Sequence, residues 1–179
     1  KDYKGGGTLD LMKAVYGDQF SLNELKKMSE EKEIIFRRIY KSNVKPIKGF
    51  IEFLSDLKSK NILIGLASNA IRKNVTLTLN ELGVYDLFDS IICGDEVSNG
   101  KPNPEMFNST LERFGLKKEN CLIFEDSIEG VSGAIRSGIS VIGVMSSSSE
   151  DILKKAGCFK TIDDYIDLDI SKIKPKINN

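Results

Sequence analysis

Two adjacent carboxylates, Glu125 and Asp126, stand directly after a short apolar run, Cys121–Phe124. The run predicts a buried strand, and the small and polar residues from Ser127 onward lead into a helical pattern. Ligands bind at the carboxyl ends of strands in open parallel sheets, and carboxylate oxygens are preferred ligands of hard cations. The pair therefore indicates a cation site, or alternatively Asp126-Ser127 only caps the following helix.

Two more polar clusters follow predicted strands. Ser68 and Asn69 come directly after Ile62–Ala67, and Lys101 lies in the loop beyond Ile91–Cys93. In a parallel sheet these clusters and the two carboxylates converge on one edge. A hydroxyl, backbone amides, a lysine and carboxylates are the groups expected around a phosphate held beside Mg²⁺. Taken singly, the first cluster could be only a strand-to-helix turn, and the lysine could be solvated.

The amino-acid composition excludes several classes of catalytic and metal site. The chain has no histidine, which excludes Ser-His-Asp and Cys-His catalysis and zinc sites built on histidine. Its three cysteines, Cys93, Cys121 and Cys158, lack metal-ligand spacing and are expected to be buried, reduced thiols. Any chemistry must then rest on carboxylates, lysine, hydroxyls and a hard cation.

Charge and hydropathy indicate a soluble protein. Lys+Arg and Asp+Glu both number 26, so there is no general basic field to attract nucleic acid. No apolar run approaches the ~20 residues that span a bilayer, and the first residues lack the apolar core of a signal peptide. We therefore expect a cytoplasmic location, with neither nucleic acid nor membrane as a partner. The sequence leaves the oligomeric state open.

The elements that must position these groups divide the chain at Pro46. Residues 8–41 predict two helices without a strand, Thr8–Tyr16 and a second that opens with the capping box of Ser21 and Glu24. Beyond Pro46, strands alternate with helices at the spacing of βαβ units, which predicts an α/β fold with a parallel sheet and helices on both faces. We expect 1–45 to be a partial helical cap and 46–179 a Rossmann-like core. The expected core strands are Ile62–Ala67, Ser90–Cys93, Cys121–Phe124, Ser140–Val144 and Phe159–Ile162, and the expected core helices are Lys48–Lys60, Asn74–Leu82, one from Pro104 to before Gly115, one ending at Ser137, and Glu150–Ala156.

The order and chemistry of these clusters resemble a known family. The matching segments are Ala67-Ser68-Asn69, Gly100-Lys101-Pro102-Asn103-Pro104-Glu105 and Phe124-Glu125-Asp126-Ser127. They are similar to the second, third and fourth motifs of the haloacid dehalogenase-like hydrolases, and most similar to the subgroup of β-phosphoglucomutase and related sugar-phosphate phosphatases. The resemblance covers residues 46 to about 162 well and the cap helices more loosely.

The resemblance implies a Mg²⁺-dependent phosphatase of small phosphorylated metabolites that works through an aspartyl-phosphate. It implies that Ser68 binds the phosphoryl group through its hydroxyl, with help from the Asn69 amide. Lys101 would offset charge between phosphate and nucleophile, and Glu125 and Asp126 would hold Mg²⁺ directly or through water. Negative charge accumulates in such a transition state, so the lysine and the metal must already be in place.

The sequence departs from the family at the nucleophile. The family's first motif, Asp-x-Asp-Gly-Thr at the end of its first strand, is absent from these 179 residues. We expect the nucleophile, and the first core strand that carries it, to lie upstream of residue 1. A sheet without that strand would expose apolar surface and open backbone edges. We also expect the chain as given to be inactive. The single Asp-x-Asp, at Asp167 and Asp169, precedes Ile170 and Ser171 and lies in the C-terminal tail, so we do not expect it to replace the motif.

The substrate-binding part of the cap also departs from the subgroup. Thr8 stands where the resemblance to β-phosphoglucomutase implies an arginine for a distal phosphate, and Lys4 and Lys32 are the remaining candidate substrate contacts. The loss of a bidentate phosphate clamp weakens the mutase hypothesis more than the phosphatase hypothesis, because a mutase must bind a phosphate at both ends of a bisphosphate intermediate. A phosphatase is the leading hypothesis. A phosphomutase, or a non-catalytic relative that binds phosphate or a protein partner, remains open.

Overall fold

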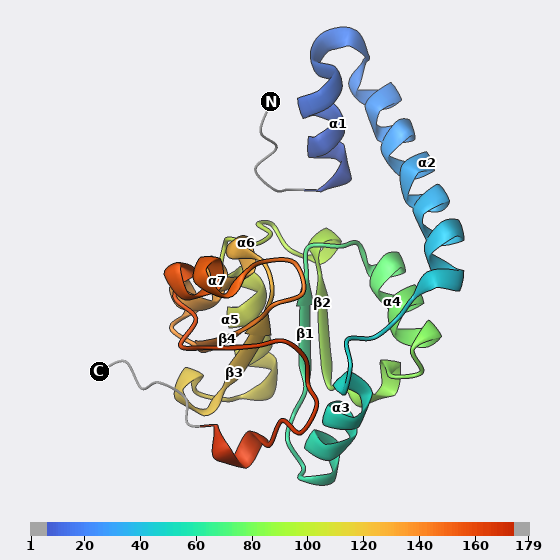
Figure 1. Ribbon diagram of the computed structural model, residues 1–179. Helices are drawn as coiled ribbons and strands as arrows, with labels where there is room; N and C mark the ends of the chain where they lie inside the picture. Colours follow the sequence, from blue (N-terminus) through green and yellow to red (C-terminus); the bar gives the residue numbers. More distant parts are fainter. Residues whose placement is uncertain (1–6, 174–179) are drawn as a thin grey trace.

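A helical hairpin precedes the α/β part of the chain (Figure 1). The computed structural model describes residues 7–173, and the hairpin consists of α1 (Thr8–Tyr16) and α2 (Leu22–Tyr40). Ser21 caps α2, its side chain accepting from the N–H of Glu24 while the Glu24 carboxylate accepts from the N–H of Ser21 at 2.8 Å. The capping box is confirmed. The division at residue 45 into cap and core stays a prediction.

Strands and helices alternate through the rest of the chain, which confirms the α/β class (Figure 1). α5 and α6 end at Gly115 and Gly138, whose φ values of 62° and 74° lie in the left-handed region that glycine adopts without strain. The helices are α3 (Phe50–Ser59), α4 (Arg72–Glu81), α5 (Glu105–Phe114), α6 (Ile128–Ser137) and α7 (Glu150–Ala156); the strands are β1 (Gly65–Ser68), β2 (Ser90–Cys93), β3 (Leu122–Glu125), β4 (Ser140–Val144) and β5 (Lys160–Ile162).

The strands are parallel, and among residues 7–173 they form two sheets. β1 pairs with β2 in one sheet, and the other has the order β3-β4-β5. Within residues 7–173, β1 and β3 each pair along one edge only. The sheet is therefore divided where no strand lies between β1 and β3.

The first core strand is shorter than predicted at its start. β1 begins at Gly65 instead of Ile62, and the Asp89 carboxylate accepts the N–H of Ile64 at 2.8 Å. A side chain thus takes the place of a strand partner there. α4 begins at Arg72, two residues earlier than expected, because the Asp95 carboxylate accepts the N–H of Arg72 at 2.8 Å.

The core is apolar and includes two of the cysteines. The rings of Phe53, Phe124 and Tyr165 pack together with centroids 5.3–5.6 Å apart. Cys93 and Cys158 are buried free thiols, and burial raises the pKa of each to about 11, which keeps them protonated. Cys121 is also free but only half-buried.

Among residues 7–173, every helix is too short or too polar to cross a bilayer.

Candidate active site

Lys101 lies between the carboxyl ends of β1 and β3. Its Nζ is 2.7 Å from Oε1 of Glu125, the last residue of β3, and donates to the carbonyl of Ala67 in β1 at 3.1 Å. The Lys101 and Glu125 side chains are only 11% and 9% exposed. The solvated-lysine alternative is therefore wrong, and the structure brings together predicted residues that are 24 positions apart.

Asn69 holds the loop that carries the lysine. Its Oδ1 accepts the backbone N–H of Lys101 at 2.8 Å, and its Nδ2 donates to the carbonyl of Lys101 at 3.1 Å. Nearby, a Cβ on Gly94 would lie 2.2 Å from the Asn69 carbonyl oxygen, so only glycine fits there. Ser68 Oγ accepts the N–H of Ala70 at 3.2 Å, which keeps the hydroxyl at the end of β1. The Asn69 side chain therefore positions Lys101, a role that the sequence did not reveal.

The Glu125 carboxylate is buried and accepts from three donors. It accepts from Ser127 Oγ at 3.2 Å and from the backbone N–H of Asp126 at 3.1 Å, in addition to Lys101. A Cβ on Gly130 would lie 1.6 Å from Glu125 Oε1, so the first turn of α6 requires glycine at this position. The side chain is thus fixed between α6 and Lys101.

The cap of α6 is Ser127 rather than either carboxylate. Ser127 Oγ accepts the N–H of Gly130 at 3.0 Å. The Asp126 carboxylate instead accepts from Ser146 Oγ at 2.9 Å. Of the Asp126-Ser127 pair, Ser127 is the cap, so the capping that the alternative predicted is confirmed at Ser127 and not at Asp126.

The two carboxylates are the candidate metal ligands. Within residues 7–173 no cluster of three or more Asp, Glu, His or Cys side chains could hold a metal by itself. Mg²⁺ commonly uses one or two carboxylates together with waters and substrate phosphate oxygens, so this hard oxygen donor set fits it. Because Glu125 already neutralises Lys101, Asp126 is the better placed of the two to contact a cation directly.

The substrate candidates of the hairpin meet at a residue that the sequence reasoning missed, Glu33. Thr8 Oγ1 donates to Glu33 Oε1, Lys32 Nζ lies 2.9 Å from the same oxygen, and Asn74 Nδ2 of α4 donates to Oε2 at 2.5 Å. Burial raises the pKa of Glu33, but the hydrogen bonds from Thr8, Lys32 and Asn74 outweigh it and leave the pKa below its usual value. Lys4 lies outside the described residues.

A periodicity signal could have found Glu33. It lies eight residues after Leu25, which places the two on one face of α2, and both are buried. A glutamate on a buried helix face needs polar partners. Its partner on the α/β part, Asn74, carries no sequence signal of its own.

The Asp-x-Asp of the tail lies far from these groups. Asp169 accepts from the N–H of Ser171 at 3.0 Å and lies 4.0 Å from Lys60 Nζ. Lys60 follows α3 and precedes β1, so this pair stands at the amino end of β1, whereas Lys101 stands at its carboxyl end. This position agrees with the expectation that Asp167 and Asp169 do not replace the missing nucleophile motif.

Comparison with known proteins identifies the family. The sequence profile of the haloacid dehalogenase-like hydrolases matches residues 6–144. This chain belongs to that family. The predicted resemblance is confirmed, and so is the Rossmann-like architecture, because a family hydrolase from Entamoeba histolytica superposes with a TM-score of 0.82 at 28% identity, covering 94% of this chain and 77% of that one.

Other members of this family have more specific names. A phosphorylated carbohydrates phosphatase from Thermotoga maritima is 36% identical over 72% of this chain and 58% of its own length. A glyceraldehyde 3-phosphate phosphatase from Methanothermobacter thermautotrophicus is 31% identical over 79% of this chain and 62% of its own length. A β-phosphoglucomutase from Clostridium difficile superposes with a TM-score of 0.79 at 28% identity, covering 94% of this chain and 75% of that one. This chain thus spans about three fifths of the length of these two curated relatives.

Proposed function

We propose that this chain carries the phosphate-binding part of a Mg²⁺-dependent phosphatase that acts on small phosphorylated metabolites of the sugar-phosphate class. Support comes from the two phosphatase relatives, whose names specify a phosphorylated carbohydrate and a phosphorylated triose. The observation that carries the proposal is the buried Lys101 held between the ends of β1 and β3, beside Ser68 and Asp126.

Each residue has a defined part in the proposed site. The Ser68 hydroxyl and the Asn69 backbone amide bind the phosphoryl oxygens, and the Lys101 ammonium neutralises charge that develops on them. Asp126, with Glu125 behind it, would hold Mg²⁺, which supplies further positive charge at the phosphoryl group when bound. Glu125 also fixes the position of the Lys101 ammonium through their 2.7 Å ion pair.

The nucleophile of the proposed reaction comes from outside these 179 residues. An aspartate attacks phosphorus, the bond to the alcohol oxygen breaks, and the alcohol takes a proton from an acid. Water then hydrolyses the acyl-phosphate and regenerates the carboxylate. The chain as given therefore turns over no substrate by this route. Sustained Mg²⁺-dependent hydrolysis of p-nitrophenyl phosphate by the chain alone would contradict this part of the proposal.

Binding of inorganic phosphate tests the site without requiring turnover. We expect titration calorimetry to show phosphate binding that is stronger with Mg²⁺ than without, and at least about tenfold weaker in Lys101→Met, because a charge-assisted hydrogen bond is lost. Lys117→Met removes an exposed lysine and is the matched control. Equal phosphate binding by the two variants would rule out the proposed site.

A phosphomutase is the second candidate, and the similarity to a β-phosphoglucomutase supports it. The two activities share the site but differ in the fate of the phosphoryl group. With the complete protein and a hexose 1-phosphate, a phosphatase releases inorganic phosphate, whereas a mutase yields the 6-phosphate. A non-catalytic relative would bind phosphate in the calorimeter but give neither product.

A further inference from the structure

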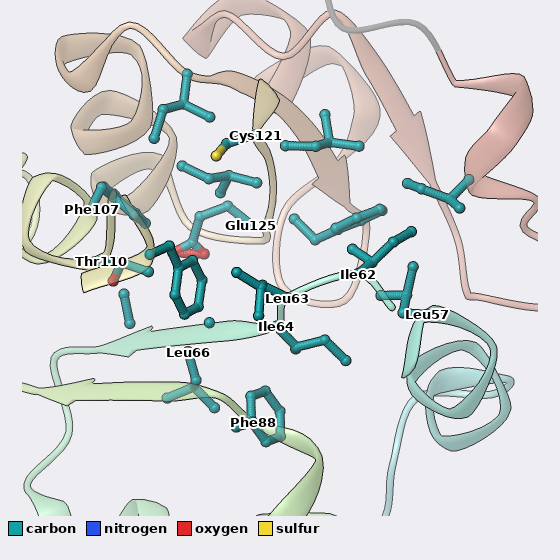
Figure 2. Close-up of a pocket in the computed structure, with 18 of the residues that line it drawn as sticks. Leu57, Ile62, Leu63, Ile64, Leu66, Phe88, Phe107, Thr110, Cys121 and Glu125 are labelled. Carbon is teal, nitrogen blue, oxygen red and sulfur yellow. The ribbon is translucent and has the colours of Figure 1, made fainter. Parts of the chain in front are cut away.

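Asp126 has surroundings different from those of its neighbour Glu125. A cavity of about 510 Å³ lies between the two sheets, with residues 62–67 on one side and residues 121–125 on the other (Figure 2). Glu125 is thus part of the cavity wall, where Lys101 holds its carboxylate, whereas Asp126 does not line the cavity. The Asp126 carboxylate instead contacts the loop that follows β4. That loop therefore decides how Asp126 is presented.

The loop after β4 is a run of four serines, Ser146–Ser149, fixed at both ends. Glu125 of β3 pairs in register with Gly143 of β4, so the carboxyl ends of the two strands lie side by side. The N–H of Met145 donates to a carbonyl of β5 at 2.8 Å, and α7 begins directly after the run. The serines are thereby held next to Asp126, one residue beyond the end of β3.

Two of these serine hydroxyls bind Asp126. Ser146 Oγ donates to Asp126 Oδ2 at 2.9 Å, and Ser147 Oγ donates to the backbone carbonyl of Asp126 at 3.0 Å. The N–H of Asp126 donates to Glu125 Oε2 at 3.1 Å. Within the part of the chain that the structure describes, the other carboxylate oxygen, Oδ1, accepts no hydrogen bond. Asp126 therefore keeps one oxygen for a cation.

The number of free oxygens matters for the choice of cation. Ca²⁺ takes more oxygen ligands than Mg²⁺, and it accepts bidentate carboxylates and backbone carbonyls in a flexible geometry. Mg²⁺ requires a near-ideal octahedron and usually combines one or two carboxylates with water. The two serine hydroxyls occupy the second carboxylate oxygen and the carbonyl oxygen of Asp126, which are the additional oxygens that a Ca²⁺ site would use.

We propose that Ser146 and Ser147 are positioning residues that limit Asp126 to a single ligand oxygen, and that they thereby make the site select Mg²⁺ over Ca²⁺. Groups that hydrogen-bond to metal ligands orient those ligands and tune the metal site. The inference rests on the proposed function only in placing a cation at Asp126. If the two hydrogen bonds only closed the loop, their loss would change the affinity for both cations alike and leave the ratio unchanged.

Competition for bound Mn²⁺ measures this ratio. Mn²⁺ prefers the same oxygen ligands as Mg²⁺ and Ca²⁺, and it broadens the NMR signals of nearby amides. In the ¹⁵N-labelled chain we expect it to broaden the amides of residues 125–127 and 146–147. Mg²⁺ or Ca²⁺ is then added until the signals recover, and the ratio of the two midpoint concentrations gives the selectivity. We expect recovery at a lower concentration of Mg²⁺ than of Ca²⁺.

Variants of the serine run test the cause of the selectivity. The double variant Ser146→Ala/Ser147→Ala should shift the midpoint ratio toward Ca²⁺ by about fivefold, as expected for the loss of exposed hydrogen bonds to a metal ligand. Ser146→Thr keeps a hydroxyl and should retain the original ratio. Ser148→Ala, in the same run, is the matched control, because neither bond to Asp126 involves Ser148. If the double variant does not fold, Ser146→Ala alone should give a shift of about threefold.

The outcomes separate this inference from the proposed function. An unchanged ratio in the alanine variants, with or without weaker binding of both cations, would overturn the role of the serines. No broadening at residues 125–127 would overturn it too, while phosphate binding that depends on Lys101 would leave the phosphate site standing. If calorimetry shows no phosphate binding but the ratio shifts as expected, the proposed function fails and the serine role stands.

Discussion

At the scale of single residues, the site is built around the ion pair of Lys101 and Glu125. Removing two charges from water costs several kcal/mol per ion unless hydrogen bonds and geometry compensate, so a buried pair is weak evidence for stability alone. Here Ser127 Oγ and the N–H of Asp126 also donate to Glu125, and Asn69 fixes the lysine backbone. The arrangement holds one ammonium group at a defined point between two strand ends, as charge stabilisation at a reacting phosphate requires.

Gly130→Ala tests how tightly Glu125 is held. Helix propensity alone would make alanine more stable by up to about 1 kcal/mol. Because the new Cβ would lie 1.6 Å from Glu125 Oε1, we expect a loss of about 2 kcal/mol or more in the free energy of unfolding, measured by urea titration. Ile128→Ala, at a 52% exposed position in the same turn, should change stability by less than about 0.5 kcal/mol. A neutral or stabilising Gly130→Ala would show that Glu125 moves freely.

At the scale of elements, Glu33 joins the hairpin to the α/β part. Its carboxylate binds Thr8 of α1 and Asn74 of α4, and Arg37 Nη1 of α2 donates to Asn74 Oδ1 at 2.9 Å. These bonds link three helices through one small polar cluster. Thr8 and Lys32, the two candidate substrate contacts within the described residues, are both partners of Glu33.

Glu33→Ala should loosen the hairpin. Without the carboxylate, the donors of Thr8, Lys32 and Asn74 lose their shared acceptor, and we expect destabilisation of about 1–3 kcal/mol. Hydrogen exchange in α1 should accelerate more than in β4. Glu30→Ala, at an exposed position on the same helix, is the control. Unchanged exchange in α1 would mean that Glu33 does not hold the hairpin in place.

The start of β1 depends on Asp89, and its contribution should vary with pH. Hydrogen bonds from Lys58 and from the Ile64 N–H lower the pKa of Asp89 in the folded protein. The stabilisation is therefore present above the unfolded pKa of about 3.9 and disappears as the pH falls through the folded pKa.

Asp89→Asn should then cost about 1 kcal/mol in the free energy of unfolding at pH 7 and less at pH 3, because asparagine loses the ion pair with Lys58. Urea titrations of both proteins at the two pH values measure the difference. Asp86→Asn, at a nearby exposed position, is the control. A difference that stays constant down to pH 3 would contradict the assigned pKa direction.

At the scale of the whole molecule, the division of the sheet is the dominant feature. β4 has a strand on each side, whereas β1 and β3 each face the cavity along one edge. The carboxyl ends of β1 and β3 still meet, because Lys101 bonds to both. The site is thus assembled across the gap by a loop residue rather than by strand pairing.

Hydrogen exchange of the chain alone should reveal this division. We expect amides of β4 to exchange at least about tenfold more slowly than those of β1 and β3, because only β4 has both edges paired. The comparison uses mass spectrometry of peptic peptides at neutral pH. Equal protection of all three strands would show that the open edges are covered.

The sequence by itself determined the fold class, the capping box at Ser21, the glycine ends of helices, and the meeting of Lys101 with Glu125. These follow from local propensity, from apolar periodicity, and from the rule that parallel strands carry their carboxyl ends to one edge. The family motifs also lie in short, continuous segments. The caps, helix ends and motifs depend on neighbours along the chain, which a sequence displays, whereas the meeting of Lys101 with Glu125 follows from the common edge of the parallel strands.

Only the tertiary structure decided the division of the sheet, the Asn69 clamp on Lys101, the Gly130 contact and the Glu33 cluster. Asn69 and Lys101 are 32 positions apart, and Glu33 and Asn74 are 41 apart. No periodicity connects such pairs, because their contact results from the packing of whole elements. Open edges were expected from the missing first strand, but the structure decided that β1 and β3 carry them, since a strand's own residues do not record which partner lies beside it.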